Sequence, residues 1–174
     1  MTACVVACLP AAAMAGNGAV DPTNPRFQPP KKAKIRDGLA IAPKGAPRAV
    51  KRAIAAANQI VDKPYRYGGG HASIKDKGYD CSGTVSYALI GSNRLKAPLD
   101  STGFMSWGKK GKGRWISVYA HGGHAYAVIA GLRLDTGSRD PASSRYGAAP
   151  GSGPRWNKSR RDSRGYVVRH PRGL

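Results

Sequence analysis

The stretch Tyr79–Gly83 reads Tyr-Asp-Cys-Ser-Gly and leads directly into an apolar run that ends at Ile90. Asp80 is a favourable N-cap residue and the apolar residues recur at helical spacing, so the stretch predicts a helix that begins at Cys81. The main-chain N–H groups of a first helical turn lack partners within the helix and carry partial positive charge. A cysteine beside them loses its proton more readily, and the thiolate is the nucleophilic form. Cys81 is therefore either a reactive thiol or a buried core residue, which cysteines often are.

The N-terminal segment 1–15 predicts a secretory signal peptide. It is uncharged and mostly apolar, and it ends in Ala13-Met14-Ala15, a small-residue cleavage pattern. The apolar run is shorter than the roughly 20 residues that span a bilayer, so no transmembrane segment is expected. An alternative is that Cys8 closes a lipoprotein cleavage box. Cleavage after Ala15 would remove two of the three cysteines and leave Cys81 without a disulfide partner, so its thiol is either inert or used.

Positive charge dominates the composition. The chain of 174 residues has 29 Lys and Arg against 9 Asp and Glu, a formal net charge of +20. Such a charge indicates polyanionic surroundings: nucleic acid, anionic lipid or an anionic cell-wall polymer. Residues 16–46 are rich in Pro, Gly, Ala and Lys, and we expect an extended, solvated linker that contacts an anionic polymer. The folded domain is expected over 47–174.

Hydrophobic periodicity and turn residues predict an α+β domain with a small antiparallel sheet. Helices are expected at 48–61, at 81–90 and, for one turn capped by Ser101-Thr102, through Trp107. A glycine loop at 68–70 precedes the cysteine helix, and a basic loop covers 109–113. Strands are expected at 114–120, 124–130, 132–136 and 166–169, with a hairpin at Gly131 and a mobile loop at about 137–165.

A cysteine nucleophile needs a base, and the base needs a third polar group that fixes its orientation. His124 opens a predicted strand. If the hairpin turn at Gly131 has an even number of residues, Asp135 on the next strand shares a face with His124. The carboxylate could then bind one imidazole nitrogen while the other faces Cys81.

The other histidines provide alternatives. His121 precedes two glycines and is expected in a turn, although it is the second candidate for the base. His71 and His170 are expected at the surface. Cys81, His121, His124 and Asp135 are all zinc-ligand types, but neither CxxC nor HExxH spacing is present, so we expect no metal and no cofactor.

Three motifs together suggest a family. Pro64–Gly69 (Pro-Tyr-Arg-Tyr-Gly-Gly), Gly78–Gly83 (Gly-Tyr-Asp-Cys-Ser-Gly) and Gly123-His124 at the start of a strand resemble the NlpC/P60 peptidases, cysteine hydrolases of bacterial cell-wall peptides. The resemblance covers about 47–136. It implies a papain-like α+β fold in which a helix N-terminus carries the nucleophile and packs on an antiparallel sheet. The Pro-Gly-Asp-Leu stretch that usually precedes the histidine strand is replaced here by 113–118.

The resemblance also implies residue roles. Cys81 matches the nucleophile and His124 the general base, whereas Asp135 stands at the third position, which is commonly histidine. Tyr65 matches a tyrosine that lines the site and helps hold the substrate or its oxyanion. Asp80 and Ser82 match positions associated with the free amine of a stem peptide.

The implied function is that of a secreted or wall-associated cysteine endopeptidase, which hydrolyses amide bonds in peptidoglycan stem peptides next to D-glutamate. Its expected partners are stem peptides and anionic wall polymers, with no specific nucleic acid. Two alternatives remain: a related cysteine amidase or acyl hydrolase, and a non-catalytic basic protein that binds walls or nucleic acid.

Overall fold

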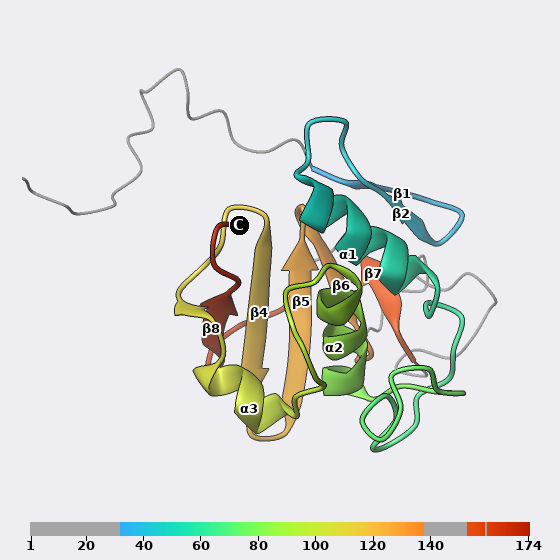
Figure 1. Ribbon diagram of the computed structural model, residues 1–174, viewed down its shortest axis with the longest axis vertical. Helices are drawn as coiled ribbons and strands as arrows, with labels where there is room; N and C mark the ends of the chain where they lie inside the picture. The colour runs from blue at the N-terminus through green and yellow to red at the C-terminus, as the bar shows by residue number, and fades with distance from the viewer. Residues whose placement is uncertain (1–31, 138–152, 159) are drawn as a thin grey trace, which may run out of the picture.

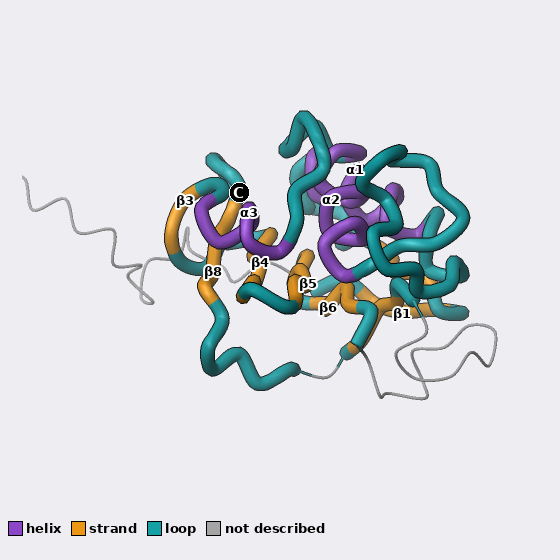
Figure 2. The backbone as a smooth tube through the Cα atoms, turned by 90° about the horizontal axis from the view of Figure 1, so that it is seen from below, coloured by secondary structure: helices purple, strands orange, loops and turns teal. Residues whose placement is uncertain are grey.

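The computed structural model of the chain describes residues 32–137, 153–158 and 160–174. The expected signal peptide, with Cys8, lies outside the described residues. Three helices cover one face of a six-stranded antiparallel sheet, with strand order β3-β8-β4-β5-β6-β7 (Figures 1 and 2). The predicted α+β class with an antiparallel sheet is therefore confirmed. No helix in the described ranges has the length and apolar content needed to cross a membrane.

The helices differ in how they are buried. They are α1 (Arg48–Asn58), α2 (Cys81–Gly91) and α3 (Ser101–Ser106). Helix α1 is amphipathic and packs its Val50 and Ile54 side into the core, whereas α2 is apolar on most sides because it lies between α1 and the sheet. A Cβ at Gly91 would collide with the Cβ of Ala56, so this glycine lets the two helices approach closely. Gly91 is the last residue of α2, and the chain turns just after it at Asn93, whose φ is positive (59°).

The sheet is built mainly from the strands that the sequence predicts. They are β3 (Lys109–Lys110), β4 (Ile116–His121), β5 (His124–Ile129), β6 (Leu132–Asp135), β7 (Arg155–Asn157) and β8 (Val167–His170). A two-residue turn joins β5 to β6, with positive φ at Ala130 (47°) and Gly131 (82°). This is the geometry of a type I′ hairpin. The turn has an even number of residues, which the predicted pairing of His124 with Asp135 requires.

The prediction of an extended linker over 16–46 is wrong for residues 34–41. Strands β1 (Lys34–Arg36) and β2 (Leu39–Ile41) form a separate hairpin over α1 (Figure 1). The Ala33 N–H donates to the carbonyl of Ala130 (2.8 Å), and the side chain of Asn58 binds both main-chain groups of Ala40. The apolar surface here comes largely from alanines, which give a weak hydrophobic signal. The turn Asp37-Gly38, with both φ positive, is a hairpin signal that the sequence does contain.

The expected loop at about 137–165 also contains structure. Strand β7 pairs with β6, and Trp156 is fully buried with its indole N–H donating to Asn58 (2.8 Å). Residues 138–152 and 159 lie outside the described residues. Two smaller differences concern caps and loops. The N-cap of α3 is Asp100, whereas Ser101-Thr102 was expected. The first two residues of the expected basic loop form β3, which pairs with β8.

Candidate active site

Cys81 is the first residue of α2. The preceding Asp80 has an extended conformation, and its carboxylate accepts from the N–H of Gly83 (2.7 Å) as an N-cap. The carbonyl of Asp80 accepts from the N–H of Thr84 (3.0 Å). The thiol of Cys81 is thus fixed at the positive end of a helix dipole, where a thiolate is stabilised.

The glycine loop supports this helix start. A Cβ at Gly83 would collide with the carbonyl oxygen of Gly69, so the loop and the first turn of α2 touch through their backbones. The N–H of Gly68 donates to the Asp80 carboxylate (3.1 Å), and the N–H of Tyr79 donates to the carbonyl of Pro64 (3.0 Å). The two motifs, which residues 70–77 separate in the sequence, are therefore one hydrogen-bonded unit.

His124 and Asp135 meet at one end of the sheet, as the hairpin parity predicts. The Nε2 atom of His124 lies 2.9 Å from Oδ1 of Asp135, whose side chain is completely buried. The Gly137 N–H also donates to Oδ1 (2.9 Å). Two guanidinium groups approach Oδ2: Nη1 of Arg161 at 3.0 Å and Nε of Arg133 at 3.3 Å. Asp135 is therefore held from several sides while it orients the imidazole.

The thiol of Cys81 lies against the same imidazole. His124 and the N–H of Ala125 lie close enough to lower its pKa, where α2 packs on β5. Because Nε2 of His124 faces Asp135, the ring nitrogen available to the thiol is Nδ1. Cysteine, histidine and aspartate thus form a continuous chain of contacts.

The pKa values of all three groups favour an ion pair. Burial raises the pKa of the Cys81 thiol, but the hydrogen bonds from His124 and Ala125 outweigh it and bring the pKa below its ordinary value. Burial lowers the pKa of His124, yet the hydrogen bonds to Asp135 and Cys81 raise it to about 9. Burial raises the pKa of Asp135, whereas its bonds to His124 and the Gly137 N–H bring it down to about 2. The shifts in the pKa values of Cys81 and His124 therefore both favour a thiolate beside an imidazolium.

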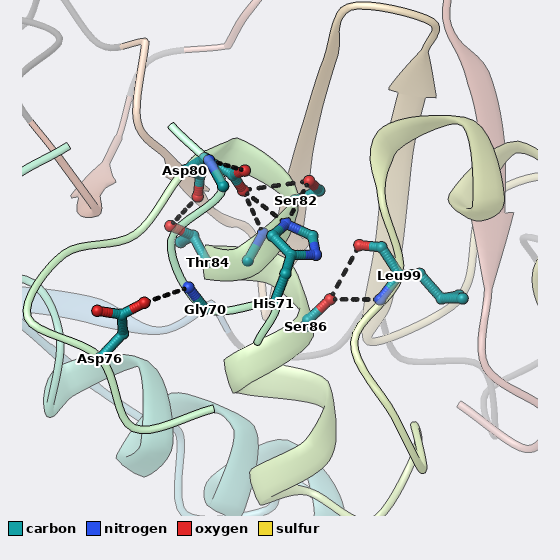
Figure 3. A network of polar contacts seen from close by, with 10 residues as sticks. Gly70, His71, Asp76, Asp80, Ser82, Thr84, Ser86 and Leu99 are labelled. Atoms are coloured by element: carbon teal, nitrogen blue, oxygen red, sulfur yellow. Dashed lines mark hydrogen bonds and ion pairs between the residues drawn. The ribbon is translucent and has the colours of Figure 1, made fainter. Parts of the chain in front are cut away.

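A second polar cluster, which Figure 3 shows, surrounds Asp80, the residue before Cys81. The Nε2 atom of His71 is 3.1 Å from Oδ1 of Asp80 and 3.2 Å from the hydroxyl of Ser82, and Ser82 also donates to Asp80 (3.1 Å). Asp80 and Ser82 are thus adjacent to Cys81 and to each other, as the motif implies. The sequence assigns His71 to the surface, whereas its side chain is only 26% exposed and belongs to this cluster. The sequence did contain a signal for this contact, because the glycine loop directly before His71 indicates that the chain turns back toward α2.

Tyr65 also borders the site. Its side chain is among the exposed large aromatic groups, at 43%. Burial of part of the ring raises the pKa of its phenol, and the charges of Cys81 and Asp80 raise it further. The phenol therefore lies within electrostatic range of the thiol.

The remaining histidines have local contacts. His121 ends β4, its Nδ1 accepts from the N–H of Gly123 (3.0 Å), and its ring packs on Tyr166. His170 contacts the carbonyl of Gly111 (3.0 Å). Within the described ranges, no group of three or more His, Cys, Asp and Glu residues is arranged to hold a metal ion.

Comparisons with known proteins give structural likenesses only. No family model and no curated protein matches the chain. Among solved structures, the chain is similar to Rv1477, described as a hypothetical invasion protein of Mycobacterium tuberculosis, with 23% identity and a TM-score of 0.49 over 80% of this chain and 72% of that one. It is also similar to a mutated form of RipA, a Resuscitation Promoting Factor Interacting protein, with 22% identity and a TM-score of 0.48 over 88% of this chain and 76% of that one.

Proposed function

We propose that the chain is a cysteine peptidase of the NlpC/P60 type, which hydrolyses an amide bond in peptidoglycan stem peptides at the bacterial cell surface. The observation that carries the proposal is the contact chain from Cys81 through His124 to the buried Asp135. A thiol at a helix N-terminus, an imidazole and a carboxylate in this order form a nucleophile, a base and an orienting group.

In the proposed reaction, the Cys81 thiolate attacks the amide carbonyl carbon and the carbonyl oxygen becomes an oxyanion. The main-chain N–H of Cys81 and the phenol of Tyr65 would stabilise that oxyanion. When the C–N bond breaks, the His124 imidazolium gives its proton to the leaving amine and a thioester remains. Water then attacks the thioester, His124 accepts the proton of that water, and the acid product leaves with the thiolate restored.

The substrate class is supported by residues beside the thiol. Asp80 and Ser82 flank Cys81, and a carboxylate with a hydroxyl at this distance could bind the free amine of a stem peptide. Both groups are bonded to His71, so an incoming amine would share or replace that contact. The resemblance to NlpC/P60 peptidases implies cleavage next to D-glutamate, and the basic composition suits an anionic wall.

Digestion of purified peptidoglycan tests the proposal. We expect the wild-type chain to release soluble muropeptides, and mass spectrometry should place the new termini next to D-glutamate. Cys81→Ala should release none, and prior alkylation of the wild type with iodoacetamide should have the same effect. Ser86→Ala is a matched control on the same helix, because Ser86 binds Leu99 away from the thiol. Digestion that survives in Cys81→Ala would exclude the thiol mechanism.

A further inference from the structure

The face of the sheet opposite the helices carries a cavity that the proposed chemistry does not use. Figure 2 shows the segment that leads into β8 lying beneath the sheet, away from α1 and α2. The cavity lies on this side, has a volume of about 350 Å³ and rests on Tyr119 and Tyr126, whose rings stack with centroids 4.7 Å apart. This volume lies at the lower end of the range for small-molecule sites.

The lining is strongly cationic. Six of its side chains are basic and none of the described lining residues is acidic: Lys32, Lys112, Arg133, Lys158, Arg160 and Arg161. Within the described residues, the one carboxylate that forms an ion pair with any of the six is Asp135, which contacts two of them. Six positive groups around one hollow repel each other, and an anion between them relieves that repulsion.

Arg133 contributes a buried charged side chain to the wall of the cavity. The residue is 93% buried, with 7% of its surface exposed, and its Nε has no hydrogen-bond partner of acceptable geometry in the described residues, although it lies 3.3 Å from Asp135. A buried donor without a partner is unfavourable. Arg161 lies beside it, with its guanidinium 5.9 Å from the Tyr126 ring centroid. Two neighbouring guanidinium groups suit the oxygen atoms of phosphate, which arginine binds through paired N–H donors.

We infer that this cavity is a binding site for a phosphate-bearing polyanion, adjoining the proposed active site through the contacts of Arg133 and Arg161 with Asp135. The shared chemistry is a phosphate group held by Arg133 and Arg161, with a second anionic group near Lys158 and Arg160. Its source is either a free small polyphosphate or a repeat unit of a phosphodiester polymer. Binding does not depend on peptidase activity, so the inference can fail while the proposed function stands.

Calorimetric titration of the full chain tests the inference with two probes, inorganic pyrophosphate and chains of poly(glycerol phosphate). The double variant Lys158→Gln/Arg160→Gln removes two exposed cavity cations that take no part in the proposed catalysis. The matched control Lys51→Gln/Arg52→Gln removes one lysine and one arginine from exposed positions of α1 and changes the net charge equally.

We expect saturable binding that weakens at least about tenfold in the cavity variant and less than about twofold in the control. Binding of pyrophosphate with this pattern identifies a site for small polyphosphates, and binding of the polymer alone identifies a polymer site. Equal weakening in both variants would show that the net charge alone attracts the probe, and would overturn the inference. Absence of saturable binding of either probe would overturn it as well.

Discussion

Two histidine–carboxylate pairs lie near Cys81, with similar separations but different burial and different positions in the fold. The His71–Asp80 distance is 3.1 Å and the His124–Asp135 distance is 2.9 Å. The first pair joins a loop to a helix cap, and its histidine and aspartate side chains are 26% and 12% exposed. The second joins two strands, and its aspartate is completely buried. Similar distances therefore conceal different surroundings.

The surroundings decide what each pair does to the thiol. The charge of Asp80 raises the pKa of Cys81, whereas the hydrogen bond and charge of His124 lower it. The Asp80 carboxylate accepts hydrogen bonds from the N–H groups of Gly68 and Gly83, so its main contribution is to hold the loop and the helix start together. Asp135 instead contacts the imidazole of His124 directly and favours its protonated form. We therefore propose that the second pair takes part in catalysis and that the first positions the helix start.

The largest expected effect separates the two histidines. His124→Ala should lower kcat by about 10²–10⁴-fold, because it removes the proton donor and acceptor. His71→Ala should lower kcat by less than about tenfold, because the hydrogen bonds that this histidine makes within the described residues go to Asp80 and Ser82. Chromatographic assay of a defined stem peptide measures both. A greater loss in His71→Ala, with an unchanged melting temperature, would reverse the assignment of the two pairs.

The next effect compares the two acids. Asp135→Asn should lower kcat by about 10²-fold, because a neutral amide no longer favours the imidazolium form of His124. Asp80→Asn should retain most activity, since asparagine also caps helices. The rate of Cys81 alkylation by iodoacetamide near neutral pH measures the thiolate directly, and it should fall in Asp135→Asn alone. An equal fall in both variants would contradict the division of roles.

The difference between the pairs also explains how much of the site the sequence could predict. His124 and Asp135 lie on adjacent strands of a two-residue hairpin, so alternation and turn length suffice to bring them to one face. The helix start at Cys81 follows from its cap. His71 lies in an irregular loop, where no periodicity fixes the direction of a side chain. Its contact with Asp80 depends on backbone contacts of Gly69 and Gly83 that only the folded chain shows.

The fold was predictable to a similar extent. Long periodic segments such as α1 and the β4–β6 strands have clear signals, and they appear with boundaries within a few residues. Strand β7 was missed because three residues around Trp156 carry no alternation, and their burial depends on pairing with β6. The β1–β2 hairpin was missed because its neighbouring prolines and lysines dominate the local composition. Arg133 and Arg161 were missed because a single arginine in sequence gives no sign of its partner.

The pH dependence of kcat/KM should reflect the second pair, His124 and Asp135, and not the first. The active form needs a thiolate, which is favoured above the lowered pKa of Cys81, and a protonated His124, which persists below its raised pKa of about 9. We therefore expect kcat/KM to rise with pH up to the lowered pKa of Cys81 and to fall about tenfold per pH unit above about 9, the pKa of His124. In Asp135→Asn the upper limb should move to lower pH, because the carboxylate that raises the His124 pKa is gone. An upper limb that stays in place would show that Asp135 does not tune the imidazole.

The smallest effect concerns the first pair as a structural element. Asp80→Ala removes the N-cap of α2 and should lower the free energy of unfolding by about 1 kcal/mol, as loss of such caps commonly does. Asp80→Asn keeps an oxygen for the Gly83 N–H and should cost less than about 0.5 kcal/mol, although it loses the charge that faces His71. Urea denaturation of the two variants at neutral pH compares these values. If both variants lose stability equally, the charge facing His71 and not the cap is what stabilises the helix start, and the first pair then resembles the second more closely than its surroundings indicate.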